Sequence, residues 1–311
     1  MVMLYYDAAF LNHETGEHPE CPARIIPALR QLHQMAIHLG CHRPMWKPLT
    51  LDDLSLVHTR EYSEFVQQFC VAGGGQLDDD TVVSVQTYDV ALLAAGAVAD
   101  AVERVLQGGE RRAFCLVRPP GHHALAGKAM GFCLFNNVAI GARLAIHKHG
   151  LASVLIVDWD VHHGNGTQEI FWTDPQVGFF SIHRWPFYPG TGAADETGAE
   201  EAMGTKLNVP IEYGTSRTDY IAAFKAALER IASRMRPELI LISAGFDAHK
   251  LDPVGSLDLE TADFQTLTQH VVEIANQFAG GRVVSVLEGG YHPIVLADCV
   301  ELHVHELLRG E

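Results

Sequence analysis

Residues 154–166 read Val-Leu-Ile-Val-Asp-Trp-Asp-Val-His-His-Gly-Asn-Gly. The first four residues are apolar and mostly β-branched, and they pass directly into a polar loop that contains glycine. A short apolar run of this kind is typical of a strand that is buried on both faces of a parallel sheet. The sequence therefore predicts a buried strand at 154–157 and a loop of polar groups at its carboxyl end.

Three further apolar runs share this pattern, at 113–117, 239–243 and 283–287. Each is also followed by a polar or glycine-rich loop. Helical patterns lie before and between the runs, at 92–106, 136–149 and 216–234. Strands that alternate with helices predict an α/β fold, in which ligands bind beyond the carboxyl ends of the strands. No repeat or linker divides the chain, so we expect a single domain over residues 1–311.

Composition argues against several classes of function. The formal net charge is −16, and the 22 Lys and Arg residues form no basic cluster of the kind that nucleic-acid binding needs. The apolar runs are far shorter than the ~20 residues that cross a membrane, and the amino terminus lacks a secretory pattern. None of the six cysteines forms a Cys-x-x-Cys pair. We therefore expect a cytoplasmic protein with reduced thiols and with no nucleic-acid or membrane partner.

Candidate metal ligands stand at two of the strand ends. Asp160 and His162 are two residues apart, and such residues project from the same side of an extended segment. Asp247, after the run at 239–243, would supply a third ligand. Three protein ligands with open remaining positions are typical of a catalytic zinc site. Nitrogen and oxygen ligation without a thiolate would also suit iron or cobalt.

Paired histidines and a tyrosine add catalytic chemistry to the same loops. His122 and His123 follow Arg-Pro-Pro-Gly at 118–121, and could offer a general base and a proton donor. Tyr291 follows two glycines that allow a close backbone approach, and its hydroxyl could bind a developing oxyanion. Each feature alone is more often structural. Their occurrence together at the strand ends of one predicted sheet favours an active site.

Five motifs occur in order along the chain: Arg-Pro-Pro-Gly-His-His (118–123), Gly-Phe-Cys-Leu-Phe-Asn-Asn (131–137), Val-Asp-Trp-Asp-Val-His-His-Gly-Asn-Gly (157–166), Ser-Ala-Gly-Phe-Asp-Ala (243–248) and Leu-Glu-Gly-Gly-Tyr (287–291). They resemble the arginase/deacetylase superfamily, and within it the class II histone deacetylases and the bacterial histone-deacetylase-like amidohydrolases. His-Pro-Glu-Cys-Pro-Ala-Arg at 18–24 resembles the family's first substrate-side loop. The resemblance implies a central, mostly parallel sheet flanked by helices, with the active site at the C-terminal ends of the strands.

The resemblance also implies hydrolysis of an N-acetyl amide at one catalytic zinc ion, Zn2+. Asp160, His162 and Asp247 would bind this ion. His122 would act as the general base on the attacking water, and His123 would assist as a proton donor or electrostatic partner. Tyr291 would polarise the acetyl carbonyl. The substrate would be an acetylated lysine side chain or a small acetylated amine, and the relatives suggest a homo-oligomer.

Further implied roles concern the surroundings of this centre. Gly131 and Phe132 would line a narrow channel for an extended alkyl chain such as that of acetyl-lysine. Asp158 would orient His122, as a hydrogen-bonded carboxylate outside the ligand set commonly does. With Ser181 and backbone carbonyls, Asp158 would also hold a structural monovalent cation, K+.

Three positions bear on the substrate. Asn165 stands where class I members have an aspartate, so His123 would have a neutral partner. Tyr188, at the end of a short loop expected at 183–188, replaces a phenylalanine of the second channel wall. Val254 stands where some polyamine-specific relatives carry a glutamate, which argues against that mode of recognition. Polyamine specificity could still arise from the acidic run at 78–80, in a loop with the glycines at 73–75.

Two other functions fit the motifs less well than deacetylation does. An arginase-like ureohydrolase needs a two-metal site with more strand-end aspartates, which the His122–His123 pair and Tyr291 do not suit. A non-catalytic ligand binder would be expected to have lost a metal ligand or the tyrosine, and this chain retains all of them.

Overall fold

The computed structural model describes residues 1–309 and is built around one eight-stranded sheet. The strand order is β2-β1-β5-β10-β9-β6-β7-β8, and every neighbouring pair is parallel. In that order the strands span Cys41–His42, Val2–Tyr5, Arg112–Cys115, Val283–Leu287, Leu239–Ala244, Val154–Asp158, Val177–Arg184 and Lys206–Ile211. The predicted α/β fold with a parallel sheet flanked by helices is confirmed.

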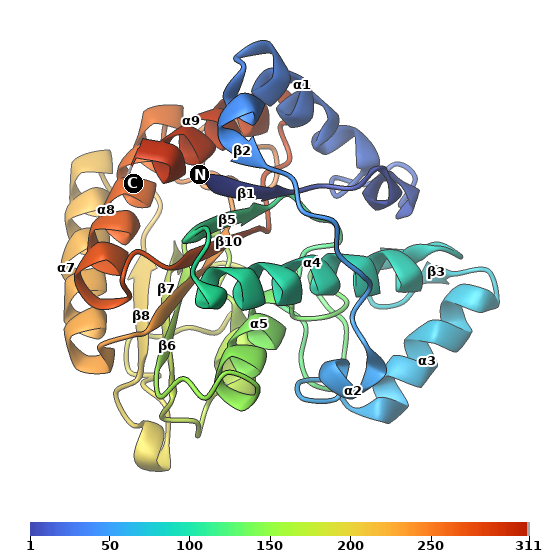
Figure 1. Ribbon diagram of the computed structural model, residues 1–311, viewed down its shortest axis with the longest axis horizontal. Coiled ribbons are helices and arrows are strands. Elements are labelled where there is room, and N and C mark those ends of the chain that lie inside the picture. The colour runs from blue at the N-terminus through green and yellow to red at the C-terminus, as the bar shows by residue number, and fades with distance from the viewer. Residues whose placement is uncertain (310–311) are drawn as a thin grey trace.

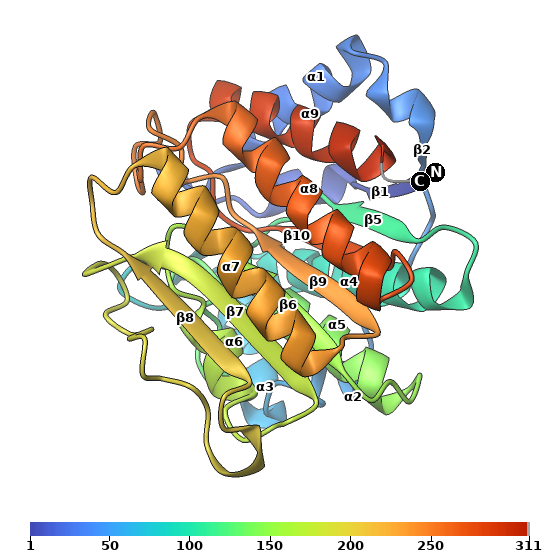
Figure 2. The same ribbon diagram turned by 90° about the vertical axis from the view of Figure 1, so that its left-hand side faces the viewer.

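Helices cover both faces of this sheet (Figure 1). On one face lie α4 (Thr87–Gln107) and α5 (Asn137–His147), and on the other lie α7 (Arg217–Met235), α8 (Thr261–Phe278) and α9 (Pro293–Arg309). Figure 2 shows α7, α8 and α9 side by side in front of the sheet. The remaining α-helices are α1 (Ile26–Gln34), which packs on α9, α2 (Leu51–Leu54), α3 (Arg60–Val71) and α6 (Asn165–Ile170).

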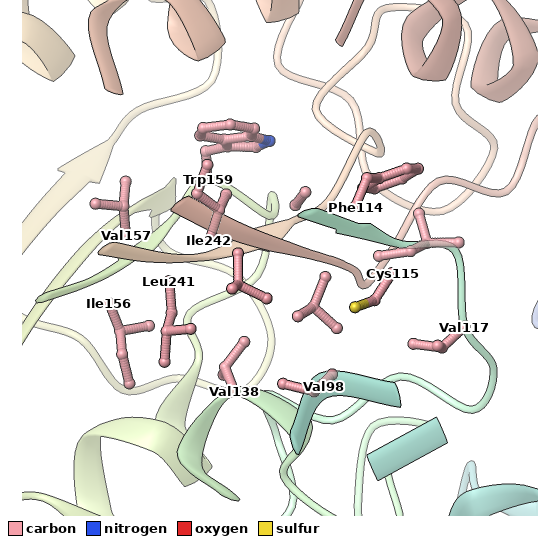
Figure 3. Packing of buried hydrophobic residues seen from close by; sticks show 14 of the residues in the cluster. Val98, Phe114, Cys115, Val117, Val138, Ile156, Val157, Trp159, Leu241 and Ile242 are labelled. Carbon is pink, nitrogen blue, oxygen red and sulfur yellow. The ribbon is translucent and has the colours of Figure 1, made fainter. Parts of the chain in front are cut away.

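The core explains why the strands are apolar along their whole length. Successive strand residues point to opposite faces, and helices cover both faces, so neither face can carry polar residues cheaply. Figure 3 shows Ile156 and Leu241 pointing toward Val138 of α5, while Val157 and Trp159 lie on the other side of the sheet. All five side chains are fully buried. No helix within residues 1–309 is long and apolar enough to cross a membrane.

The four predicted strands are β5, β6, β9 and β10, which stand next to one another in the centre of the sheet. The outer strands were not predicted. The expected loop at 183–188 is wrong at its start, because β7 continues to Arg184 and includes His183. Likewise, the glycine-rich and acidic loop forms a small antiparallel hairpin of β3 (Gly75–Gln76) and β4 (Val82–Val83). β7 contains polar side chains and β3 contains glycine, so neither strand shows the continuous apolar run by which a buried strand is predicted.

Candidate metal centre and active site

Two neighbouring strands bring three metal-binding side chains together. Asp160 and His162 follow β6, and Asp247 follows β9. All three are buried, and their ligand atoms lie within 4.8 Å of one another. Nδ1 of His162 lies 3.0 Å from Oδ1 of Asp160 and 3.3 Å from Oδ2 of Asp247. The fold thus places the three sequence-predicted ligands around one point.

Backbone amides orient both carboxylates from outside. Oδ1 of Asp247 accepts a hydrogen bond from the Val161 N–H at 2.9 Å, and Oδ2 of Asp160 accepts one from the Gly289 N–H at 2.8 Å. Oδ2 of Asp247 is buried and accepts no hydrogen bond from the residues that the structure describes. A buried carboxylate oxygen without a donor is costly unless a cation lies close to it.

Glycines make room for these carboxylates. A Cβ atom on Gly245 would lie 2.2 Å from Oδ2 of Asp160, and one on Gly289 would lie 2.2 Å from Oδ2 of Asp247. Such distances are far below van der Waals contact, so the backbone can pass the ligands here only as glycine. Gly289, one of the two glycines before Tyr291, is therefore required at this position.

The charges of the centre fit a divalent cation. Burial raises the pKa of Asp247, and the Asp160 carboxylate raises it further. Burial alone would lower the pKa of His162, but Asp160 and Asp247 outweigh it and raise the pKa to about 9. The single imidazole of His162 can carry at most one positive charge, which does not balance the two negative charges of the buried Asp160 and Asp247 carboxylates. A zinc, iron or cobalt ion would supply that charge with a suitable donor set.

The two adjacent histidines lie beside this centre with different partners. Nδ1 of His122 lies 2.9 Å from Oδ2 of the fully buried Asp158, and Nδ1 of His123 lies 2.7 Å from Oδ1 of Asn165. Their ring centroids are 4.0 Å apart. Nε2 of His122 lies 3.9 Å from Oδ1 of Asp160. The Nε2 atoms of His122 and His123 are thus available to a group bound near the proposed metal ligands.

The neighbours of His122 and His123 shift the pKa values of the two imidazoles in opposite directions. Burial would lower the pKa of His122, but Asp158 and Asp160 raise it to about 10. Burial and the neighbouring His122 hold the pKa of His123 well below its ordinary value. The carboxylates thus favour the charged form of His122, whereas burial and His122 favour the neutral form of His123.

Ser181 lies beside Asp158, because β6 and β7 pair these two residues in register. Its hydroxyl forms a hydrogen bond with Nδ1 of His183 at 2.9 Å, and all three side chains are fully buried. Burial raises the pKa of Asp158, although His122 lowers it. Asp158 and Ser181, the two side chains expected to hold a monovalent cation, thus occupy paired positions on neighbouring strands.

Tyr291 is held on several sides. Its N–H donates to Oδ2 of Asp252 at 2.7 Å, and the guanidinium carbon of Arg24 lies 5.0 Å from its ring centroid. The Phe132 ring meets it edge-on at 5.7 Å. Burial raises the pKa of Tyr291 well above its ordinary value, although Arg24 lowers it. The hydroxyl is therefore protonated, and can donate a hydrogen bond, at neutral pH.

A cavity of about 220 Å³ leads to these groups. The four channel residues predicted from the sequence all line it: Gly131, Phe132, Tyr188 and Val254. His123, His162 and Tyr291 lie in its wall as well, together with Asp80 and Phe187. Phe187 was not predicted. Its neighbour Tyr188 was the only wall residue expected from this loop, whereas both aromatic side chains face the cavity.

A second group of potential ligands does not form a second metal site. His122, Cys133 and Glu288 have ligand atoms within 4.8 Å of one another. Glu288, however, already accepts hydrogen bonds from the N–H groups of Gly121 and His122 and from the Ser243 hydroxyl. This carboxylate fixes the strand-end loops, and the described residues therefore give no support to a two-metal ureohydrolase.

Sequence reasoning also missed the ionic network behind the site. Glu20 is fully buried, forms ion pairs with Arg24 at 3.0 Å and Arg118 at 2.5 Å, and lies 3.2 Å from Nε2 of His13. Arg24 in turn donates to the backbone oxygens of Gly290 and Glu288. Burial would raise the pKa of Glu20, but Arg118 and His13 hold it well below its ordinary value. Both Glu20 and Arg24 belong to the motif at 18–24.

We expect Glu20→Gln to lower the free energy of unfolding by roughly 3–5 kcal/mol, because two buried guanidinium groups lose their compensating charge. Urea denaturation at neutral pH measures this loss. Because Glu20 is ionised in the folded protein, the advantage of wild type over the variant should shrink as the pH falls below the ordinary glutamate pKa of about 4.3. Glu212→Gln, at an exposed position, is the matched control. Equal stability of both variants would contradict the prediction.

Taken together, a parallel sheet with a buried ligand triad, paired histidines and a tyrosine at its carboxyl edge suits a hydrolytic enzyme. Comparison with known proteins agrees with this class. A family profile described as histone deacetylase domain matches residues 18–307. Polyamine deacetylase HDAC10 of Homo sapiens is 40% identical over 323 residues, covering 98% of this chain and 48% of that protein.

Two further comparisons extend the result. The histone deacetylase-like amidohydrolase of Pseudomonas aeruginosa is 38% identical over 261 residues, covering 84% of this chain and 69% of that protein. The crystal structure of the HDA15 HD domain matches with a TM-score of 0.92 and 36% identity, covering 99% of this chain and 89% of that one. The chain belongs to the histone deacetylase family, and the resemblance inferred from its motifs is confirmed. Membership supports a hydrolase activity of the deacetylase or amidohydrolase type.

Proposed function

We propose that the protein is a zinc-dependent deacetylase that hydrolyses an N-acetyl amide of a lysine side chain or of a related small amine. One observation supports this best. Asp160, His162 and Asp247 converge beside the His122–His123 pair, at a cavity whose wall includes His123, His162 and Tyr291. The cavity of about 220 Å³, walled by Phe132, Phe187 and Tyr188, would suit an apolar alkyl chain.

Asp160, His162 and Asp247 would hold the zinc ion. When bound, zinc would supply the Lewis acidity that polarises the acetyl carbonyl and lowers the pKa of the attacking water toward ~7. Asp158 and Ser181 are the proposed ligands of a structural K+ ion. Their burial and their register on β6 and β7 support this proposal.

The chain's own residues would move the protons and orient the substrate. His122 is the proposed base for the attacking water, held in place by Asp158, and His123 the proposed donor to the leaving amine. Tyr291 would donate a hydrogen bond to the acetyl oxygen as negative charge develops there. Gly131, Phe132, Tyr188 and Val254 would enclose the alkyl chain and exclude water.

Acetylated polyamines are the second candidate substrate, and one side chain favours them. Asp80 lies in the cavity wall beside Tyr188, where a carboxylate could attract a substrate ammonium. The similarity to a polyamine deacetylase points the same way. Val254, in contrast, offers no charge from the opposite wall. The cytoplasmic location and a homo-oligomeric state stay predictions from the sequence.

Acetate release from a panel of substrates tests this function. The zinc-loaded protein is given acetyl-lysine peptides, a trifluoroacetyl-lysine peptide, acetylated polyamines and small N-acetyl amides, each with and without a hydroxamate inhibitor. We expect hydroxamate-sensitive turnover, with the lysine peptides ahead of the polyamines because Val254 cannot pair with an ammonium. Preference for polyamines would keep the mechanism and change the substrate. A complete lack of sensitive turnover would instead favour a non-catalytic ligand binder.

A further inference from the structure

Arg184, the last residue of β7, lies in an aromatic setting at the edge of the candidate site. Its guanidinium carbon lies 4.2 Å from the ring centroid of Phe187 and 4.8 Å from that of Tyr213. Its Nη1 donates to the backbone oxygen of Gly255 at 3.1 Å. Within residues 1–309, Arg184 forms no ion pair with a carboxylate. Its charge is therefore engaged with two rings and one carbonyl, a use to which the planar guanidinium is well suited.

Phe187 carries this contact on to a proposed metal ligand. Its ring stacks on the imidazole of His162 with a centroid distance of 5.2 Å and an interplanar angle of 15°. The other aromatic neighbours of His162 are His123 at 5.8 Å and Tyr188 at 6.0 Å, and both meet it edge-on. Phe187 is thus the nearest of these rings and the only one of them parallel to the imidazole. Phe187 therefore lies where it can support the orientation in which Nδ1 of His162 faces the carboxylates.

His162 lacks one contact that usually fixes the ring of a metal-binding histidine. Such histidines commonly donate their second ring N–H to a carboxylate or carbonyl, which fixes the ring. Among the described residues, no group accepts a hydrogen bond from Nε2 of His162. The ring can turn only about its Cβ–Cγ bond, and the contacts of Nδ1 with Asp160 and Asp247 limit that rotation from one side of the ring. The parallel Phe187 ring opposes that rotation.

Arg184 also reaches the other side of the site. Gly255, which accepts its hydrogen bond, follows the channel residue Val254. A Cβ atom on Gly255 would lie 2.3 Å from the backbone oxygen of Asp247, so this segment packs directly against the third proposed ligand. One guanidinium therefore joins the Phe187 wall of the channel to the segment that carries Val254 and borders Asp247.

We infer that Arg184 is a positioning residue for the metal centre, which acts by holding Phe187 in its parallel stack on His162. The inference rests on the proposed zinc site. Loss of the guanidinium would leave Phe187 free to tilt, and His162 would then bind the metal at a less favourable angle. Loss of a group that orients a ligand in this way typically weakens metal binding ~10–100-fold.

The first test compares zinc affinity and the cobalt spectrum of wild type, Arg184→Met and Arg184→Lys. Affinity is measured by competition with a chromogenic chelator, and ligand geometry by the visible absorption of the Co2+-substituted protein. We expect Arg184→Met to weaken zinc binding at least ~10-fold and to shift the cobalt bands. Arg184→Lys keeps the charge and most of the aliphatic stem but loses the planar stack. It should therefore show the same change at a smaller size, and it replaces Met if that variant does not fold.

A matched control and a double-mutant cycle test whether Arg184 acts on the metal centre through Phe187. Arg143 also lies over an aromatic ring, 4.7 Å from the centroid of Phe171, but away from the ligands. Arg143→Met should leave zinc affinity and the cobalt spectrum unchanged. In a Phe187→Leu background, Arg184→Met should have little further effect on zinc affinity, because the intermediary is gone.

The outcomes separate this inference from the proposed function. Wild type that binds neither zinc nor cobalt would overturn the proposed function itself. Wild type that binds zinc, with a folded Arg184→Met variant of equal affinity and identical cobalt spectrum, would overturn only the positioning role. An undiminished effect of Arg184→Met in the Phe187→Leu background would also overturn it, because Arg184 would then act by another route.

Discussion

Asp247→Asn should abolish zinc binding and acetate release together. The change preserves the size of the side chain and the oxygen that can accept the Val161 N–H. It replaces Oδ2, the buried oxygen without a hydrogen-bond donor, by an amide that carries hydrogens and no charge. One of three ligands is thereby lost, so we expect a fall in zinc affinity larger than the ~10–100-fold that loss of an orienting partner costs.

The measurement is zinc content per chain after dialysis against a weak chelator, with acetate release on the same samples. Asp263→Asn is the matched control, because Asp263 is also buried but caps α8 and pairs with Arg217. The control should keep its zinc even if it loses some stability. Full turnover by Asp247→Asn protein that contains no zinc would remove this residue from the metal site and the metal from the reaction.

The centre of the fold was predictable because a strand that is buried on both faces of the sheet has a continuous apolar sequence. β6, β9 and β10 are apolar along most of their length and end in polar loops, so both the strands and the position of the site follow from pattern. β7 lacks such a sequence, since Ser181, His183 and Arg184 interrupt its second half. Their burial is balanced by hydrogen bonds and ring contacts that only the three-dimensional arrangement reveals.

The candidate site shows the same division. Asp160, His162 and Asp247 could be singled out because residue type and spacing alone identify candidate metal ligands. Glu288 and Glu20 stand in motifs that were quoted, yet their work is to hold backbone N–H groups and guanidiniums that are distant in sequence. Such partners cannot be read from one segment. Phe187 was missed for a related reason, because nothing in Pro-Phe-Tyr-Pro tells that both adjacent rings face the cavity.

Tyr291→Phe is expected to lower kcat by ~10²–10³-fold while leaving zinc content and folding intact, which is the typical cost of removing one oxyanion donor. The hydroxyl is the only group lost. The backbone N–H of residue 291 would still donate to Asp252, and the ring would still pack between Arg24 and Phe132. KM should change little, because a hydrogen bond to the developing oxyanion is made mainly in the transition state.

Steady-state kinetics on the best substrate of the panel, with metal analysis of the same preparation, measure this effect. Tyr88→Phe is the matched control, because its hydroxyl bonds Ser63 between α3 and α4, away from the cavity. The burial that keeps the Tyr291 hydroxyl protonated makes it a donor across the neutral range, so the loss in kcat should be similar from pH 6 to pH 8. A kcat equal to that of wild type would show that the acetyl oxygen is stabilised by other groups, and Tyr291 would then be a wall of the channel only.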